Sequence, residues 1–228
     1  MNKEWSDLNK TLQMQLRKES TFSEGIKTLL TLRQALMDEL LNMKHELRRE
    51  DFNAMPFPNA KGYHSKTIAY SIWHVFRIED IVAHSLIQND SEIFNAYQSK
   101  IGAPIITTGN ELAGSQIEDF SKAIDLDALY AYAVAVKDST DRLLKQLSYR
   151  DLHRKFGEAD KERLQRLQVV STDESACWLI EYWCGKDVRG LLRMPFSRHW
   201  IMHIEASIRI KNKIHPRSNC VPKLGRLK

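Results

Sequence analysis

Apolar residues recur at helical intervals over long stretches of this sequence, and this periodicity constrains its fold more than any other feature. The clearest case is segment 24–49, where one apolar face is built by Ile26, Leu29, Leu30, Leu32, Leu36, Leu40 and Leu41. Such spacing places side chains on one side of an α-helix. The 228 residues include only 9 glycines and 6 prolines, and no β-branched or aromatic run alternates with period two. The pattern predicts an all-α protein.

Short polar breaks divide the chain into the expected helices. Long helices are predicted over four segments: 24–49, 65–88, 115–147 and 194–216. The third is interrupted near Asp125, and the fourth is opened by Pro195 and stopped by Pro216, because proline fits a first helical turn but cannot continue a helix. Shorter helices are expected between the third and fourth. Amphipathic helices must bury their apolar faces against one another, so we predict a four-helix bundle with short accessory helices.

Two pairs of residues have the spacing of a capping box, in which a hydroxyl and a carboxylate satisfy free amides of a first helical turn. These pairs are Thr21 with Glu24 and Ser115 with Glu118. They predict that helices begin at Thr21 and at Ser115.

The charge is distributed unevenly along the chain. The formal net charge is +5, but residues 207–228 hold seven basic residues and no acidic one. Subtracting these seven from the 34 basic residues leaves 27, against 29 acidic residues, so residues 1–206 have a formal net charge of −2. We therefore predict a single helical-bundle domain over 1–216, with 1–20 as an N-terminal extension or short helix, and a basic C-terminal tail over 217–228. The tail lacks aromatic residues for base stacking, so we predict a solvated tail rather than a nucleic-acid-binding one, with weak electrostatic contact to acidic partners as the alternative.

Several classes of protein are excluded by the sequence. The N-terminus has no apolar stretch of signal-peptide length, and the longest apolar run, 129–136, is too short to span a bilayer, which predicts a cytoplasmic protein without membrane contact. Three cysteines without C-x-x-C spacing argue against a disulfide framework and a cysteine zinc site. Cys177 and Cys184 share an aromatic-rich segment with Trp178 that is interpreted as core packing. No nucleophile-elbow, phosphate-loop or dinucleotide motif is present.

The candidate chemistry lies in the histidines. His199 and His203 are four residues apart, so a helix would present both imidazoles on one face, together with Met202 and Ala206. Burying an imidazole is costly unless it finds a partner, and a metal ion would serve both. Hydrogen bonds to neighbouring helices are the alternative.

A third histidine strengthens the metal hypothesis. On its predicted helix, His74 shares a face with Ile78 and Ile81 and points to the core, away from Arg77, Asp80 and His84. Facing helices of a bundle often supply the ligands of one metal ion. We therefore predict a metal site formed by His74, His199 and His203.

The remaining candidates have weaker patterns. His45 and His153 are predicted to be exposed, and His215 is expected to complement the dipole at the end of the last helix. His64 lies just before the second helix. It is predicted to be either an ordinary loop residue or a residue near the open side of the metal site. Tyr70 could line the pocket or pack in the core. Glu79 is expected either to bond a neighbour or to remain on the solvated surface. No catalytic residue is predicted.

The sequence resembles the DinB-like (damage-inducible-protein-like) superfamily, which includes the bacillithiol and mycothiol S-transferase-like proteins. The resemblance rests on Trp73-His74 within residues 72–80 (IWHVFRIED), on the His199/His203 pair, and on the order of segments over 24–214. It implies an up-down-down-up four-helix bundle, often dimeric. It further implies one divalent metal, nickel or zinc, with iron also compatible, held by His74, His199 and His203. Residues 148–195 look longer than the family requires, and the basic tail is additional.

Two functions are predicted as alternatives for this chain. Three neutral imidazoles leave a coordination position open, which is typical of a catalytic metal. The resemblance implies a low-molecular-weight thiol as the small-molecule substrate of a metal-dependent S-transferase. The alternative is a non-enzymatic, stress-related bundle for binding or dimerisation, in which the histidines or the metal are structural.

Overall fold

The protein is described by a computed structural model over residues 2–216, and the regular structure of this part is helical throughout. The predicted all-α class is therefore confirmed for the described residues. The predicted basic tail, 217–228, and Cys220 lie outside them.

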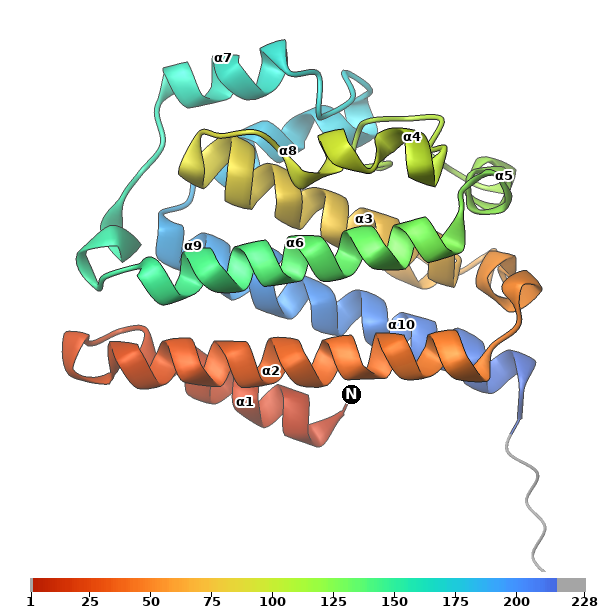
Figure 1. Cartoon of the computed structure of the whole chain (residues 1–228), viewed down its shortest axis with the longest axis horizontal. Helices are drawn as coiled ribbons and strands as arrows, with labels where there is room; N and C mark the ends of the chain where they lie inside the picture. The colour runs from red at the N-terminus through yellow and green to blue at the C-terminus, as the bar shows by residue number, and fades with distance from the viewer. Residues whose placement is uncertain (1, 217–228) are drawn as a thin grey trace, which may run out of the picture.

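Long helices form the centre of the molecule (Figure 1). They are α2 (Glu19–Glu46), α3 (Ile68–Asp80), α6 (Leu126–Gln146) and α10 (His199–Ile214). Helix α3 packs against α6 and α10, and α2 packs against the same two helices. In Figure 1, α2 and α10 run from left to right, while α3 and α6 run from right to left. Two π-helical segments extend these helices: η3 (Ile81–Gln88) continues α3, and η6 (Met194–Arg198) leads into α10.

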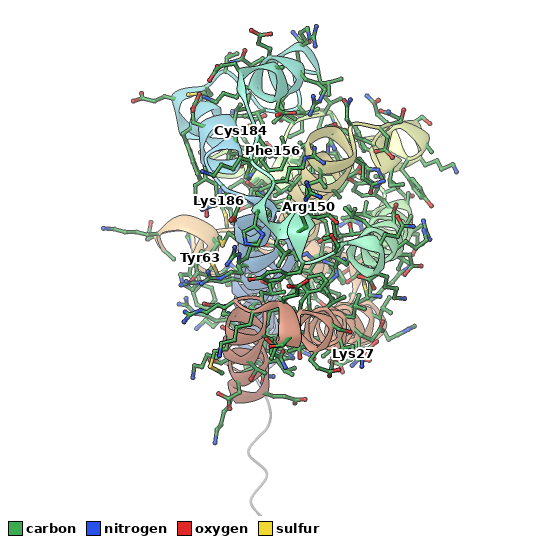
Figure 2. The ribbon with its side chains drawn as sticks, turned by 90° about the vertical axis from the view of Figure 1, so that its left-hand side faces the viewer. Lys27, Tyr63, Arg150, Phe156, Cys184 and Lys186 are labelled. Carbon is green, nitrogen blue, oxygen red and sulfur yellow. The ribbon has the colours of Figure 1, made fainter. Side chains whose placement is uncertain are left out.

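Shorter helices surround this centre. Helix α1 (Lys3–Gln15) packs along α2, so the predicted extension at 1–20 contains a helix. The others are η1 (Arg49–Asn53), η2 (Gly62–His64), η4 (Ile93–Ala96), α4 (Gln98–Ile101), α5 (Ser115–Ala123), η5 (Arg150–His153), α7 (Glu158–Arg166), α8 (Glu174–Cys184) and α9 (Val188–Arg193). Figure 2 shows that α8, marked by Cys184, lies at the opposite side of the molecule from the start of α2, marked by Lys27. Because α1 packs along α2, helices α1 and α8 lie on different sides of the bundle.

Most predicted helix ends agree with the structure. The second long helix ends at Asn89, whose left-handed φ of 58° is a conformation that asparagine tolerates well. Asp125 caps α6, with its carboxylate accepting from the backbone N–H of Ala128, so the interruption predicted there is confirmed. Neither capping box forms, but the predicted helix start at Ser115 is confirmed, whereas the one at Thr21 is wrong. Helix α2 begins at Glu19, and the hydroxyl of Thr21 instead donates to the carbonyl of Gln15 at 2.7 Å, tying α2 to α1. Helix α5 is capped by Gly114.

Helix α3 is buried around its whole circumference, since every residue of Ile68–Asp80 is buried. The prediction that Arg77, Asp80 and His84 lie on an outward face is therefore wrong. Segment 92–106 covers that face: the Arg77 guanidinium donates to the carbonyl of Ile106, and the Asp80 carboxylate accepts from the backbone N–H groups of residues 93 and 94. Periodicity could not show this, because polar residues mark a solvated face only where nothing covers it.

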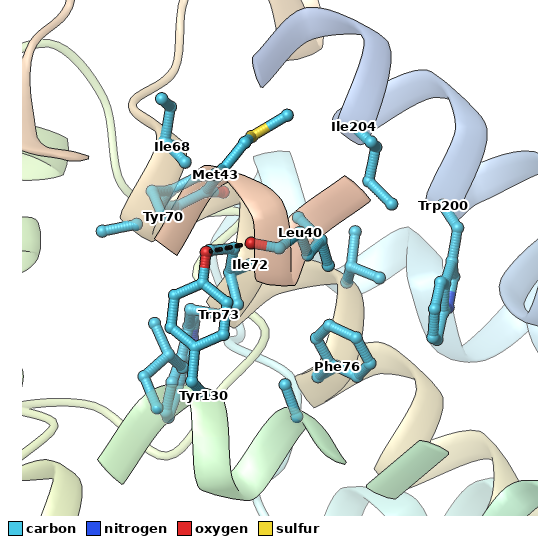
Figure 3. Packing of buried hydrophobic residues seen from close by; sticks show 14 of the residues in the cluster. Leu40, Met43, Ile68, Tyr70, Ile72, Trp73, Phe76, Tyr130, Trp200 and Ile204 are labelled. Atoms are coloured by element: carbon cyan, nitrogen blue, oxygen red, sulfur yellow. Dashed lines mark hydrogen bonds between the residues drawn. The ribbon is translucent and has the colours of Figure 1, made fainter. Parts of the chain in front are cut away.

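Two apolar clusters fill the bundle, with buried charges between them. Figure 3 shows the first cluster, which includes Phe76, Tyr130 and Trp200. The second contains Ile78 and Phe196 and lies around α1, α7, α8 and α9. At their boundary, Arg33 and Glu79 form a fully buried ion pair with 2.7 Å between Nη2 and Oε1. Arg33 also pairs with Asp141 of α6, and Trp200 Nε1 donates to Glu79 at 2.7 Å. Glu79 is therefore a central bonded residue rather than a solvated one.

Within residues 2–216, none of the helices combines the length and apolar character that a membrane crossing requires.

Candidate metal centre

His74 of α3 and His199 and His203 of α10 come together in the bundle. One ring nitrogen from each histidine lies within 4.8 Å of the other two, and all three side chains are buried. The ring centroids are 5.0 Å apart for His74 and His199, 4.8 Å for His74 and His203, and 4.7 Å for His199 and His203. The residues predicted from the sequence therefore lie close enough to hold one metal ion. His199 is the first residue of α10, immediately after the π-helical segment η6.

The orientation of His74 is set by a loop. Its Nδ1 lies 2.8 Å from the carbonyl oxygen of Thr108. A carbonyl can only accept, so Nδ1 carries the proton, and Nε2 keeps its lone pair. Metal-binding histidines commonly donate their other ring N–H in this way, which fixes the tautomer and the ring plane.

His199 and His203 lack such a partner. The Nδ1 atoms of both rings are buried, and no group of the described residues hydrogen-bonds to them. Buried polar atoms are rarely left unpaired in a protein core. The alternative was that neighbouring helices hydrogen-bond to both histidines. At the two Nδ1 atoms the described residues provide no such bond. The donor set fits a divalent ion, because imidazole nitrogens are common ligands of zinc, nickel, iron and copper.

Burial keeps the three imidazoles neutral. It lowers the pKa of His74 to about 4, the bond to the Thr108 carbonyl opposing this shift in part. Burial, reinforced by the neighbouring histidines, also places the pKa values of His199 and His203 well below the usual value. Only a neutral imidazole has a lone pair to donate, so the site is ready for a metal at neutral pH.

We expect the metal-free protein to lose stability as the pH falls. Unfolded imidazoles have a pKa of about 6.5. Below this pH the histidines are protonated in the unfolded chain but stay neutral in the folded protein. Each of the three therefore lowers the free energy of unfolding by up to about 1.4 kcal/mol for every pH unit of acidification. For His74 this loss ends near its folded pKa of about 4. Urea unfolding at about pH 7 and about pH 5 measures the effect. His203→Gln should reduce the slope and exposed His153→Gln should not; equal slopes for all three proteins would contradict the interpretation.

A cavity of about 190 Å³ adjoins two of the three histidines. It is lined by His74, Ile78, Asn110, Trp178, Leu179, Tyr182, Trp183, Met194, Pro195 and His199. Most of these side chains are apolar or aromatic, and they come from α3, α8, η6, α10 and the loop that carries Thr108. A small molecule in this cavity would lie beside His74 and His199.

The other histidines differ in their positions. His45 and His153 are exposed, as predicted. His215 ends α10, and its Nε2 lies 2.9 Å from an Asp51 carboxylate oxygen, a partner that the sequence did not indicate. His64 belongs to η2, which packs against α10, and its ring is 4.1 Å from that of Tyr63. Tyr63 in turn lies 5.8 Å from His203, between centroids, so His64 is near the centre without being part of the histidine group.

The interpretation of both α8 cysteines as core residues is wrong for one of them. Cys184 is buried, and this burial raises the pKa of its thiol to about 11. Cys177 is exposed, and Trp178 beside it is 49% exposed. Helix α8 is an outer layer that buries a single face, so the remaining positions reach solvent or the cavity.

Tyr70 connects the core to the loop that holds His74. Its hydroxyl donates to the carbonyl of Gly109 at 2.8 Å, and its ring stacks on His74 with centroids 5.5 Å apart. Thr108 and Asn110, the neighbours of Gly109, were not found from the sequence. Thr108 acts on His74 through its backbone carbonyl, which leaves no signal in residue type.

We expect Tyr70→Phe to weaken metal binding about tenfold, as the loss of an outer partner of a ligand typically does. Tyr130→Phe is the matched control, because Tyr130 also donates one buried hydrogen bond, to the carbonyl of Leu40 at 2.8 Å (Figure 3). Both variants should lose about 1–2 kcal/mol of stability. Only Tyr70→Phe should change the metal affinity measured by competition with a chromogenic chelator. Equal affinities in the two variants would show that the loop does not support His74.

Comparison with known proteins shows similarity in fold only. No family model matches the chain, and no curated protein matches its sequence. A solved structure with a similar fold is the crystal structure of a conserved protein from Enterococcus faecalis, with a TM-score of 0.57 and 13% sequence identity. The similarity covers 82% of this chain and 94% of that one. The chain therefore shares its helical fold with that protein, and its chemistry must be inferred from its own residues.

Proposed function

We propose that this protein binds one divalent metal ion through His74, His199 and His203, and that it transfers a low-molecular-weight thiol to an electrophile. The observation that carries the proposal is the placement of three neutral imidazoles within 4.8 Å of one another, beside a cavity that reaches two of them. Three protein ligands with adjoining free space are typical of catalytic rather than structural sites.

The residues of this chain would prepare the reaction. A divalent ion held by three imidazoles would lower the pKa of a thiol that reaches its open side. The Thr108 carbonyl fixes the His74 ring, and the apolar walls of the cavity limit the access of water. Exclusion of water strengthens the electrostatic interactions in the site.

A sequence motif and the directions of the long helices support the proposal that the protein is a member of the DinB-like superfamily. Residues 72–80 and the His199/His203 pair supply the motif. The opposite directions of α2 and α10 relative to α3 and α6 agree with an up-down-down-up order (Figure 1). Nickel or zinc is the proposed metal, with iron as a further candidate, because imidazole ligands suit all three.

The experiment begins with elemental analysis of protein expressed without a histidine tag, for which about one divalent ion per chain is expected. Cobalt(II) is then substituted for the native metal, and mercaptoethanol is added as the thiol. Thiolate binding should produce a sulfur-to-cobalt charge-transfer band. Absence of stoichiometric metal would overturn the whole proposal. Metal without the thiol band would reject the transferase and leave a structural site in a non-enzymatic bundle.

A further inference from the structure

We infer that the cavity beside His74 and His199 binds the electrophile, and that α8 selects an uncharged aromatic or otherwise apolar one. This inference rests on the proposed function, because it assigns the second substrate of the same centre. Segment 148–195, which contains α8, looks longer than the family resemblance requires.

The lining of the cavity determines the chemical class of its ligand. Among the lining residues, only His74, His199 and Asn110 have strongly polar side chains, and none has a carboxylate, ammonium or guanidinium group. A charged ligand would lose its hydration there without gaining a counter-charge from any of these side chains. The volume of about 190 Å³ suits a single aromatic ring with small substituents, since an apolar cavity of about 150 Å³ holds benzene.

Trp178 is the residue in the best position to contact such a ring. Although it is 49% exposed, its orientation is held: the indole Nε1 donates to the carbonyl of Ser175 at 2.9 Å, and the ring packs edge-on against Tyr182, with centroids 5.5 Å apart. An aromatic side chain that is already ordered loses little conformational entropy when a ligand binds.

The cavity and the metal centre share one loop. The Asn110 side chain accepts from the Thr108 hydroxyl at 2.8 Å, and the Asn110 carbonyl accepts from the Ser175 hydroxyl at 3.4 Å. Thr108 also holds His74. Helix α8 and His74 therefore contact the same loop, which would bring a ring bound on α8 next to a thiol at the centre.

With chlorodinitrobenzene as the electrophile, the proposed transfer is a substitution of chloride by the thiol sulfur. The thiol first releases its proton to solvent. Its sulfur then attacks the carbon that carries chlorine, the S–C bond forms, and the C–Cl bond breaks with chloride leaving as the anion with the electron pair. No oxidant or reductant is required.

Binding is tested separately from turnover. The probe is meta-dinitrobenzene, which has the ring but no leaving group, and its affinity for the metal-loaded protein is measured by calorimetry. We expect Trp178→Ala to weaken binding about tenfold and Trp178→Phe to restore most of it, as an aromatic contact in an apolar site would. Leu167→Ala is the matched control, because Leu167 is a similarly exposed apolar residue, at 45%, outside this cavity. Metal content and melting temperature should remain unchanged in all three variants.

Kinetics provide the second measurement. Trp178→Ala should raise the KM for chlorodinitrobenzene about tenfold, with little change for iodoacetamide, a small polar electrophile. The inference is overturned if meta-dinitrobenzene does not bind the native protein, or if Trp178→Ala binds it as well as Leu167→Ala does. In either case the cobalt–thiol band would still report on the proposed function, so the two failures are distinguishable.

Discussion

Replacing His203 with alanine is expected to abolish stoichiometric metal binding. His203 supplies one of the three imidazoles that come together in the described part of the chain, and two imidazoles hold a divalent ion much more weakly than three. Loss of an outer partner alone costs about 10- to 100-fold in affinity, so loss of a ligand should cost at least about 1,000-fold. Metal at about 1,000 times its Kd stabilises a folded protein by about 4 kcal/mol, and this stabilisation should disappear as well.

Two measurements on His203→Ala check this expectation. Elemental analysis gives the metal content, and thermal unfolding with and without added zinc or nickel gives the stabilisation by metal. His153→Ala serves as the control, because His153 is exposed on η5 and belongs to no histidine group. Retention of one ion per chain by His203→Ala would exclude the three-histidine site.

Replacing Glu79 with alanine is expected to cause the largest loss of stability. Glu79 is fully buried and accepts from Arg33 through both carboxylate oxygens, at 2.8 and 2.7 Å, and from Trp200 Nε1. Its removal leaves the buried Arg33 with only Asp141 as an acidic partner and leaves the Trp200 indole unpaired. Breaking a buried ion pair from one side typically costs about 3–5 kcal/mol.

Urea unfolding of Glu79→Ala at neutral pH measures this loss. Glu24→Ala is the matched control, since Glu24 pairs with Lys27 on the exposed surface at 2.8 Å, and an exposed pair contributes less than about 1 kcal/mol. Because Trp200 follows His199 directly, Glu79→Ala should also weaken metal binding. A loss no larger than that of Glu24→Ala would mean that Arg33 finds a replacement partner.

Much of the helical plan could be predicted, because it depends on local rules. The period of apolar residues located α2, α3, α6 and α10, and proline located both ends of the last helix. The spacing of His199 and His203 placed two imidazoles on one face without knowledge of the fold. The polar outer face assigned to the second helix was wrong, because residues distant in sequence cover it.

The long helices and the three candidate histidines could be predicted from the sequence, since helical position depends on residues within a few turns of one another. Three contacts became visible in the folded protein alone: Thr108 holds His74, Glu79 joins Arg33 to Trp200, and Trp178 lies at a cavity instead of in the core. These contacts join segments far apart along the chain. They depend on backbone groups and on which helix covers which face. Neither of these features produces a repeating pattern of residue types along the sequence.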